Sequence, residues 1–422
     1  MEDYTNKSQM KRVAISLFER IALFVAVLAL AFSCEPSTGG LETVSPEAVG
    51  MNSAKLSQID REVALAISEG DCPGAVVCVV RGDKIAYLKA YGSKQIVPER
   101  VPMTPETVFD LASCSKCVGT TLAFMQLVEN GYCRLSDKVK MYIPDFKPWT
   151  DPKTGKKTDI TIENLLTHTS GVDAYIDVAK FRERFGDNQP DSLIRYIATE
   201  TGRAFRPGSD YLYSCLNFVT LQNILQNITG EKLCDYAQTH VFDVLGLEST
   251  CYRPAETRPD LMPRIAPTEV QEDGQPLRGV VHDPLANHCN AGNSGNAGVF
   301  SSSADLAVIC AAIMNGGEFK GRRILSPLAV EAMARVPSGN DPSVGRALGW
   351  DNHSESATLR GDLFSRCRTI CHTGYTGPSI VIDMEARTAV IILANRVHPK
   401  DDGSLARLRA RISNIVAGSI EK

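Results

Sequence analysis

The amino-acid sequence predicts an α/β fold of the α+β type, in which an antiparallel β-sheet is flanked by terminal helices and interrupted by a mainly helical subdomain. Two observations lead to this prediction. Both ends of the chain combine a helical apolar pattern with a β-hairpin pattern, whereas the middle has mainly helical spacing. Because antiparallel sheets built from hairpins normally have one face on a core, we expect the terminal helices to cover this sheet.

The N-terminal part of the domain supplies the first helix and hairpin. Apolar residues recur at helical spacing over residues 56–67, just after the potential capping residues Asn52 and Ser53. A continuous apolar run at 75–80 is followed by a turn and by an alternating segment at 85–91, which is typical of two strands joined as a hairpin.

The C-terminal end mirrors this arrangement. Strands are predicted at 379–383 and 388–394, followed by a closing helix over 405–416. Between the two ends, the helical insertion is predicted to span roughly 120–345 of a domain that covers 45–422. Its clearest helices lie at 162–168, 218–228, 305–315 and 327–335.

Charge and cysteine content restrict the function. The chain has 422 residues, a formal net charge of −4 and no basic stripe, which argues against nucleic acid as a partner. Its 13 cysteines are scattered without zinc-site spacing. The pair His282-Asp283 and His288 suggest a metal site, but no further ligand lies at a suitable spacing along the chain. We therefore expect no metal and no cofactor, and interpret these three residues as belonging to a loop.

Residues 1–34 have the pattern of an export signal. The twelve-residue apolar run 21–32 is too short to span a bilayer comfortably but fits the central region of a signal peptide. Cys34 follows small residues, as in a loosely matched bacterial lipobox; the alternative is ordinary signal peptidase cleavage beside an incidental cysteine. We predict an exported protein, anchored by lipid on Cys34 to a membrane facing the periplasm or cell surface, or periplasmic, with a linker at 35–44.

The sequence Ser113-Cys114-Ser115-Lys116 precedes an apolar helical pattern that ends near Gly131. This spacing predicts Ser113 in the first turn of a helix, with Lys116 close to the same face. A serine hydroxyl needs an adjacent base to act as a nucleophile, and an amine whose pKa is lowered can serve. Taken alone, the four residues are better explained by an N-terminal capping serine and a solvated lysine.

Two further motifs follow, Tyr213-Ser214-Cys215 and His372-Thr373-Gly374; residues 165–171 lie before the first of them, and residues 295–301 lie between the two. Together with Ser113-x-x-Lys116, this set resembles the serine β-lactamase and penicillin-binding protein superfamily. The similarity is greatest to class C β-lactamases, DD-peptidases and related family VIII esterases, and covers about residues 45–418.

The resemblance implies an acyl-enzyme mechanism without a cofactor. Ser113 is then the nucleophile, Lys116 its partner and Tyr213 all or part of the general base. The backbone N–H groups of Ser113 and Tyr375 are expected to form the oxyanion hole. The implied catalytic residues are Ser113, Lys116, Tyr213 and His372, and the implied substrate-binding residues are Cys215, Thr373, Gly374 and Tyr375.

Two positions depart from the family pattern. Cys215 stands where relatives have asparagine, and a thiol cannot reproduce the two-way hydrogen bonding of an amide. His372 stands where many relatives have lysine, so its cation would titrate near neutral pH. Asn217 can replace the missing amide only if the local loop differs.

These departures favour an esterase or DD-peptidase-like amidase over a β-lactamase, acting on a small ester, amide or peptide. A hypothesis of another class is a catalytically weak penicillin-binding or sensing module. The sequence does not indicate whether the protein is a monomer or an oligomer.

Among the other polar and aromatic residues, we interpret His168 as structural, Cys114 and Cys117 as core, and Trp350 as part of the cleft wall.

Overall fold

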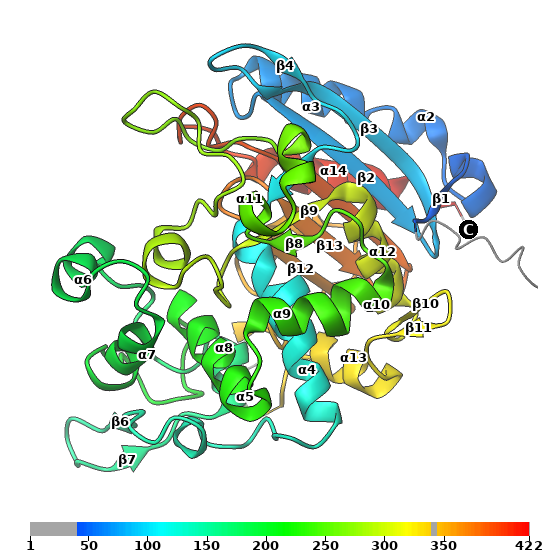
Figure 1. The fold of residues 1–422 in the computed structure, drawn as a ribbon. Helices are drawn as coiled ribbons and strands as arrows, with labels where there is room; N and C mark the ends of the chain where they lie inside the picture. Colours follow the sequence, from blue (N-terminus) through cyan, green and yellow to red (C-terminus); the bar gives the residue numbers. More distant parts are fainter. Residues whose placement is uncertain (1–39, 339–343, 422) are drawn as a thin grey trace, which may run out of the picture. The chain divides into compact units, whose positions relative to one another are not determined.

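A seven-stranded sheet organises the fold, as seen in the computed structural model, which describes residues 40–338 and 344–421 (Figure 1). The strand order is β1-β3-β2-β14-β13-β12, with β4 beside β3. All neighbouring strands are antiparallel except β1 and β3. The strands are β1 (Glu42–Thr43), β2 (Gly74–Arg81), β3 (Lys84–Gln95), β4 (Val101–Pro102), β12 (Thr369–Thr373), β13 (Ser379–Asp383) and β14 (Thr388–Ala394).

Both faces of the sheet are covered. Successive side chains of its central strands point to opposite sides, and on β2 both sets of side chains are buried. On β2, Val77 and Val79 pack with the terminal helices α3 (Ile59–Ser68) and α14 (Ala406–Gly418). The alternate residues of β2 pack with α12 (Ser303–Met314) on the opposite face. The antiparallel sheet and its terminal helices confirm the fold class predicted from the sequence.

Three details differ from the sequence prediction. α12 lies within the range assigned to the helical insertion, yet it packs on the sheet. The first helix is divided into α2 (Ser53–Leu56) and α3, with the side chain of Asn52 accepting a hydrogen bond at its start. Glu42 and Thr43, assigned to the linker, form β1 and pair with β3.

The predicted signal peptide and Cys34 lie outside the described residues. Within the ranges that the structure describes, no helix is both long enough and apolar enough to cross a membrane.

The helical part of the chain lies beside the sheet layer in Figure 1 and contains most of the remaining helices. A small sheet, β5 (Val108–Asp110), β9 (Val299–Ser302) and β8 (Cys251–Tyr252), joins it to the segment that carries Ser113. The other helices are α4 (Leu122–Glu129), α5 (Ile162–Leu166), α6 (Val178–Phe185), α7 (Pro190–Thr199), α8 (Cys215–Thr229), α9 (Leu233–Ala237), α10 (Asp243–Leu245), α11 (Pro254–Thr257) and α13 (Pro327–Ala334). Two short hairpins are β6 (Trp149–Thr150) with β7 (Lys157–Thr158), and β10 (Glu318–Phe319) with β11 (Arg322–Arg323).

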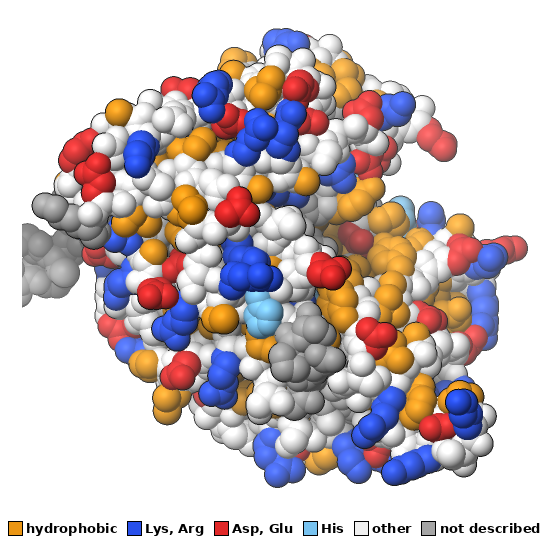
Figure 2. Space-filling model, turned by 180° about the vertical axis from the view of Figure 1, so that it is seen from behind, with side chains coloured by type: hydrophobic (Ala, Val, Ile, Leu, Met, Phe, Trp, Pro, Cys, Tyr) orange, Lys and Arg blue, Asp and Glu red, His pale blue; other side chains and the backbone are white. Residues whose placement is uncertain are grey.

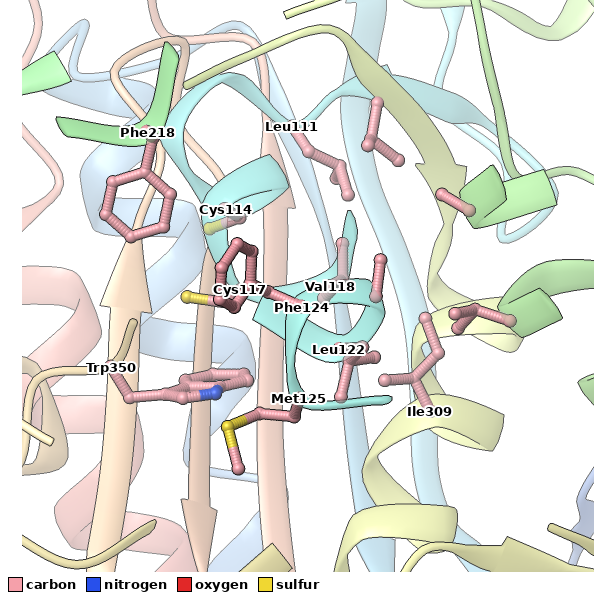
Figure 3. Packing of buried hydrophobic residues seen from close by; sticks show 14 of the residues in the cluster. Leu111, Cys114, Cys117, Val118, Leu122, Phe124, Met125, Phe218, Ile309 and Trp350 are labelled. Carbon is pink, nitrogen blue, oxygen red and sulfur yellow. The ribbon is translucent and has the colours of Figure 1, made fainter. Parts of the chain in front are cut away.

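The segment that follows β5 is helical throughout but changes its winding. A 3₁₀ turn over Ala112–Cys114 leads into a π-helical stretch over Lys116–Thr121 and then into α4. Its apolar side is fully buried, and Figure 3 shows the sulfur atoms of Cys114 and Cys117 within this packing. Such wider turns inside helices are frequent at functional sites.

Candidate active site

Ser113 lies in a tightly held turn between β5 and the helix. Ala112, directly before it, adopts a left-handed conformation with φ +44°, which is uncommon for a residue with a side chain. The backbone N–H of Ala112 donates to Asp110 at 2.8 Å, and the other carboxylate oxygen of Asp110 accepts from the N–H of His282 at 2.7 Å. The buried Asp110 therefore fixes the strained turn that presents Ser113.

Lys116 is fully buried and makes three polar contacts through its ammonium group. Its Nζ lies 3.0 Å from Ser113 Oγ, 2.8 Å from the carbonyl oxygen of Asn296 and 3.6 Å from Cys215 Sγ. Since an ammonium has three donors, these contacts use its full capacity. The structure thus brings the predicted nucleophile and its partner together as the sequence spacing implied.

Tyr213 completes this group. Its ring centroid lies 5.1 Å from Lys116 Nζ and 6.1 Å from the ring centroid of His372. Burial raises the pKa of Tyr213, and the cation of Lys116 lowers it only in part, so the phenol is protonated at neutral pH. Burial acts to lower the pKa of Lys116, but Cys215 and Tyr213, when ionised, raise it above the ordinary lysine value. Both Tyr213 and Lys116 therefore carry their protons at neutral pH.

β12 ends against the nucleophile turn. The thiol of Cys114 lies 3.7 Å from the carbonyl oxygen of His372, and Thr376 donates through its hydroxyl to the carbonyl of Asp110 at 2.8 Å. A Cβ on Gly374 would lie only 2.3 Å from the carbonyl oxygen of Leu111. Glycine at this position is thus what permits the strand to approach the turn so closely.

His372 is in the cleft, but the prediction that it supplies a titrating cation there is wrong. Its side chain is buried, and burial together with Arg346 and Lys116 lowers its pKa well below the ordinary histidine value. Its Nδ1–H donates to the carbonyl oxygen of Thr373 at 2.8 Å, and its Nε2 has no partner. At neutral pH the ring is therefore uncharged.

Asn217 does not replace the missing amide at position 215. It is buried in the first turn of α8, where its Oδ1 accepts from the hydroxyl of Ser170 at 2.7 Å and its Nδ2 lies 3.4 Å from His168 Nδ1. The carbonyl of Asn296 instead provides the oxygen next to Lys116. At position 215 a substrate therefore meets a thiol and no amide.

Sequence reasoning missed Arg346, which is the cation of this cleft. Its side chain is 3% exposed and pairs with the equally buried Asp351 at 3.0 Å. The guanidinium lies 5.8 Å from the ring centroid of Tyr211 and 6.0 Å from that of Tyr213. Its Nε and Nη2 atoms have no hydrogen-bond partner. A single arginine before an apolar stretch is a weak sequence signal, and only the fold brings it opposite Ser113.

Two cavities meet at Ser113. One, of about 350 Å³, is lined by Arg346, His372 and Thr373, and the other, of about 420 Å³, by Cys215 and three carboxylates. Ser113, Tyr213 and Tyr375 line both. The carboxylates are those of Glu269, Asp283 and Asp401. Figure 2 shows one face of the protein hollowed, with hydrophobic side chains gathered along the hollow. The second cavity is therefore acidic, whereas the charge of Arg346 in the first is paired with that of Asp351, which lines the same cavity.

Of the remaining candidates, His282 lines the second cavity, and Cys114, Cys117 and Trp350 belong to the core. His282 lies 3.2 Å from Glu269, and among the described residues no group of three His, Cys, Asp or Glu side chains could hold a metal ion. Cys114 and Cys117 are buried, and Cys117 lies 3.1 Å from the carbonyl of Gly349. Trp350 is fully buried within the same packing rather than in the cleft wall.

The chain is similar to known proteins over most of its length. Residues 57–414 match the family model described as Beta-lactamase. A protein of Salmonella agona named "Putative D-alanyl-D-alanine carboxypeptidase" is 31% identical over 380 residues, covering 85% of this chain and 86% of that protein. The counterpart from Salmonella typhimurium is 30% identical with the same coverage.

Two solved structures illustrate the likeness of fold. "EstCE1, a hydrolase with promiscuous acyltransferase activity" superposes with a TM-score of 0.68 at 24% identity, covering 86% of this chain and 99% of that one. The octameric penicillin-binding protein homologue from Pyrococcus abyssi gives 0.63 at 22% identity, covering 86% of this chain and 75% of that one.

Proposed function

The chain belongs to the serine β-lactamase and penicillin-binding protein superfamily, and on this premise we propose that it hydrolyses ester or amide bonds through an acyl-enzyme on Ser113. The observation that carries the proposal is the contact of 3.0 Å between Ser113 Oγ and Lys116 Nζ, with the ring of Tyr213 5.1 Å from the same ammonium and lining both cavities beside Ser113. A nucleophile within hydrogen-bond reach of its activating groups is the arrangement that acyl transfer requires.

In this mechanism Ser113 Oγ forms a bond to the substrate carbonyl carbon while its proton passes to Tyr213. Lys116 remains cationic and stabilises the tyrosine in its anionic form. The proton then goes to the leaving group as its bond to the carbonyl carbon breaks. The N–H groups of Ser113 and Tyr375 are the proposed donors to the oxyanion. Water releases the acyl group by the reverse transfers, and Tyr213 accepts the proton of that water.

Arg346 supports a substrate with a free carboxylate in its leaving group. The guanidinium is buried in the cavity beside Ser113, is paired with one carboxylate and has two nitrogen atoms without a partner. Arginine binds carboxylates in a bidentate manner, and a buried unpaired donor favours a ligand that satisfies it. The relatives in Salmonella carry names that refer to D-alanyl-D-alanine, which has such a carboxylate.

A second candidate, ester hydrolysis, is favoured by Cys215. Amide bonds require help in orienting the substrate amide and in protonating the leaving amine, whereas an alkoxide leaves more readily. A thiol is a weak hydrogen-bond donor and acceptor, so it gives a substrate amide less support than an asparagine. We therefore rank esters bearing a carboxylate first, peptides with a D-alanyl terminus second and β-lactams third.

The test has two steps. A fluorophosphonate or labelled penicillin should attach to Ser113, and Ser113→Ala should abolish both the label and the hydrolysis. Hydrolysis of acyl-D-alanyl-D-lactate, acyl-D-alanyl-D-alanine and acyl-D-alanyl-D-alaninamide is then compared. The first two differ only in ester or amide, and the last two only in the carboxylate. Labelling that persists in Ser113→Ala refutes the mechanism.

The same substrates test Arg346. Arg346→Lys keeps the charge but loses the bidentate geometry, so it should weaken turnover of the carboxylate substrates and leave the alaninamide nearly unchanged. An equal loss for the alanine and alaninamide substrates would contradict carboxylate recognition. One burst without turnover would instead support the weak binding or sensing module.

We also propose that the protein is exported and held at a membrane by lipid on Cys34. The support is the apolar run and the cysteine that follows it in the sequence. The native protein should partition into detergent, and Cys34→Ala should not. A mature protein without lipid mass would refute the anchor.

A further inference from the structure

We propose that His168 is a positioning residue, which holds Tyr213 in the orientation needed for proton exchange with Ser113 and Lys116. The inference rests on the proposed acyl-enzyme function and adds a residue to it. It is based on three contacts of His168: hydrogen bonds to the residues directly before and after Tyr213, and stacking on the ring of Tyr213.

His168 is itself placed by a constrained loop. It is the second residue after α5, is fully buried and has φ +57°, in the left-handed region that residues with side chains seldom adopt. On either side of it, Thr167 and Thr169 are joined through their hydroxyls at 2.9 Å, and Thr167 also donates to the carbonyl of Glu163 at 2.8 Å. An unfavourable backbone conformation is retained where the surroundings fix it, and such sites are often functional.

From this position His168 binds the chain on both sides of Tyr213. Its carbonyl oxygen accepts the N–H of Leu212 at 3.0 Å, and its Nδ1 accepts the N–H of Ser214 at 3.0 Å. Its ring is stacked on the ring of Tyr213, with centroids 4.3 Å apart and an angle of 30° between the planes. His168 therefore holds the residues on both sides of Tyr213 as well as its ring, and Lys116 Nζ lies 5.1 Å from the centroid of the same ring.

The charge state of His168 suits this role. Because Nδ1 accepts a hydrogen bond, the proton of the neutral ring is on Nε2, which is buried without a partner. Burial and the facing groups Arg346, Lys116 and His372 lower the pKa of His168 well below its ordinary value. A neutral ring stacks on the tyrosine without adding a second cation beside Lys116.

Two variants separate the two kinds of contact. His168→Gln retains a side-chain acceptor for Ser214 but loses the stacked ring, and His168→Phe retains a ring but loses the acceptor. We expect each to reduce the acylation rate of Ser113 by about 10- to 100-fold, with KM changed less, because small misplacements of a reacting group are costly. His240→Gln is the matched control, since the ring of His240 also lies against a tyrosine, Tyr236, with centroids 4.2 Å apart and an angle of 35° between the planes, but it is remote in sequence from the motifs.

The decisive measurement is a double-mutant cycle with Tyr213→Phe. If His168 acts through Tyr213, His168→Gln should cause little further loss in the Tyr213→Phe background. In the presence of Tyr213, the apparent pKa of acylation should also move upward, because a tyrosine that leaves Lys116 loses the charge that lowers its pKa. If His168 had only a structural role, its replacement would change the amount of active enzyme, measured by fluorophosphonate titration, but would not shift the apparent pKa of acylation.

Additive losses in the double mutant, or acylation rates in both His168 variants equal to that of His240→Gln, would overturn the assignment. Should His168→Gln fail to fold, as judged by circular dichroism, His168→Phe carries the same cycle. Failure of the proposed function is detected separately, because it would appear as hydrolysis that persists in Ser113→Ala.

Discussion

At the scale of single residues, the important question is where the proton of the catalytic cluster resides. The Ser113 hydroxyl contacts Lys116, whose pKa is raised once the ionised states of Cys215 and Tyr213 are included, and it lines the same cavity as Tyr213, whose pKa is raised by burial. Both partners are therefore protonated at neutral pH, and neither is a ready base. His372 is neutral, and the lowering of its pKa makes its Nε2 a weak proton acceptor. The reactive form has an ionised tyrosine, and its population increases with pH.

This distribution predicts the pH dependence of acylation. Below the pKa of Tyr213 the reactive fraction increases about tenfold per pH unit, and because that pKa exceeds the ordinary ~10, the rate should still rise above pH 9. Lys116→Ala removes the charge that lowers this pKa and should reduce the neutral rate by about 100-fold or more. Ester acylation measured from pH 6 to 10, corrected for spontaneous hydrolysis, checks this. A plateau already reached at pH 7 would contradict the assignment of the proton.

Cys215 gives a second prediction at this scale. Cys215→Asn restores an amide that can both donate and accept hydrogen bonds beside Lys116. We expect turnover of the D-alanyl-D-alanine substrate to increase relative to the D-lactate ester, by roughly 10-fold, the equivalent of one ordinary hydrogen bond. Cys215→Ser is the control, because it changes sulfur to oxygen without supplying an amide. An unchanged amide-to-ester ratio in Cys215→Asn would show that residue 215 does not select between them.

At the scale of elements, the site depends on β12 meeting the turn after β5. Sequence spacing predicted the Ser113–Lys116 pair, because both lie on one short helical segment. The approach of β12 involves residues separated by about 260 positions, so the motif order could indicate it only through family resemblance. Arg346 escaped prediction for the same reason, since it is brought to the cleft by a loop with no periodic pattern. The burial of both faces of the sheet, by contrast, agrees with the continuous apolar run at 75–80, in which the residues facing either side are all apolar.

The close approach of β12 to the turn can be tested at Gly374. Gly374→Ala would place a methyl group 2.3 Å from the carbonyl oxygen of Leu111, so the strand end must shift away from Ser113. We expect acylation to fall by about 100-fold, whereas unfolding free energy should fall by only ~1–3 kcal/mol, as for other overpacked sites. Gly418→Ala is the control, because its added carbon meets only Leu363, at 3.8 Å. Equal activity in the two variants would mean that the position of β12 does not limit acylation.

At the scale of the whole molecule, buried neutral histidines occur well beyond the catalytic cluster. His398 is 2% exposed; its Nε2 accepts from the N–H of Ile96 at 3.0 Å, and its Nδ1–H donates to the carbonyl of Thr268 at 2.9 Å. Burial lowers its pKa, as it does for His168 and His372. Protonation of His398 would place a second donor against the N–H of Ile96. These three residues therefore link the stability of the domain to pH.

The sign of this linkage follows from the lowered pKa values. Below about pH 6.5 the unfolded chain binds protons that the folded chain does not, so each of these histidines makes stability fall as pH falls, by up to ~1.4 kcal/mol per pH unit. Asp110 and Asp305, whose pKa values burial raises, act in the opposite sense, so the total slope alone is not the test. His398→Gln should make the change in unfolding free energy between pH 6.5 and 5.5 smaller by up to ~1.4 kcal/mol. Urea unfolding at both pH values measures this difference. An identical change in the wild-type protein and in His398→Gln would show that His398 is protonated equally in the folded and unfolded chains.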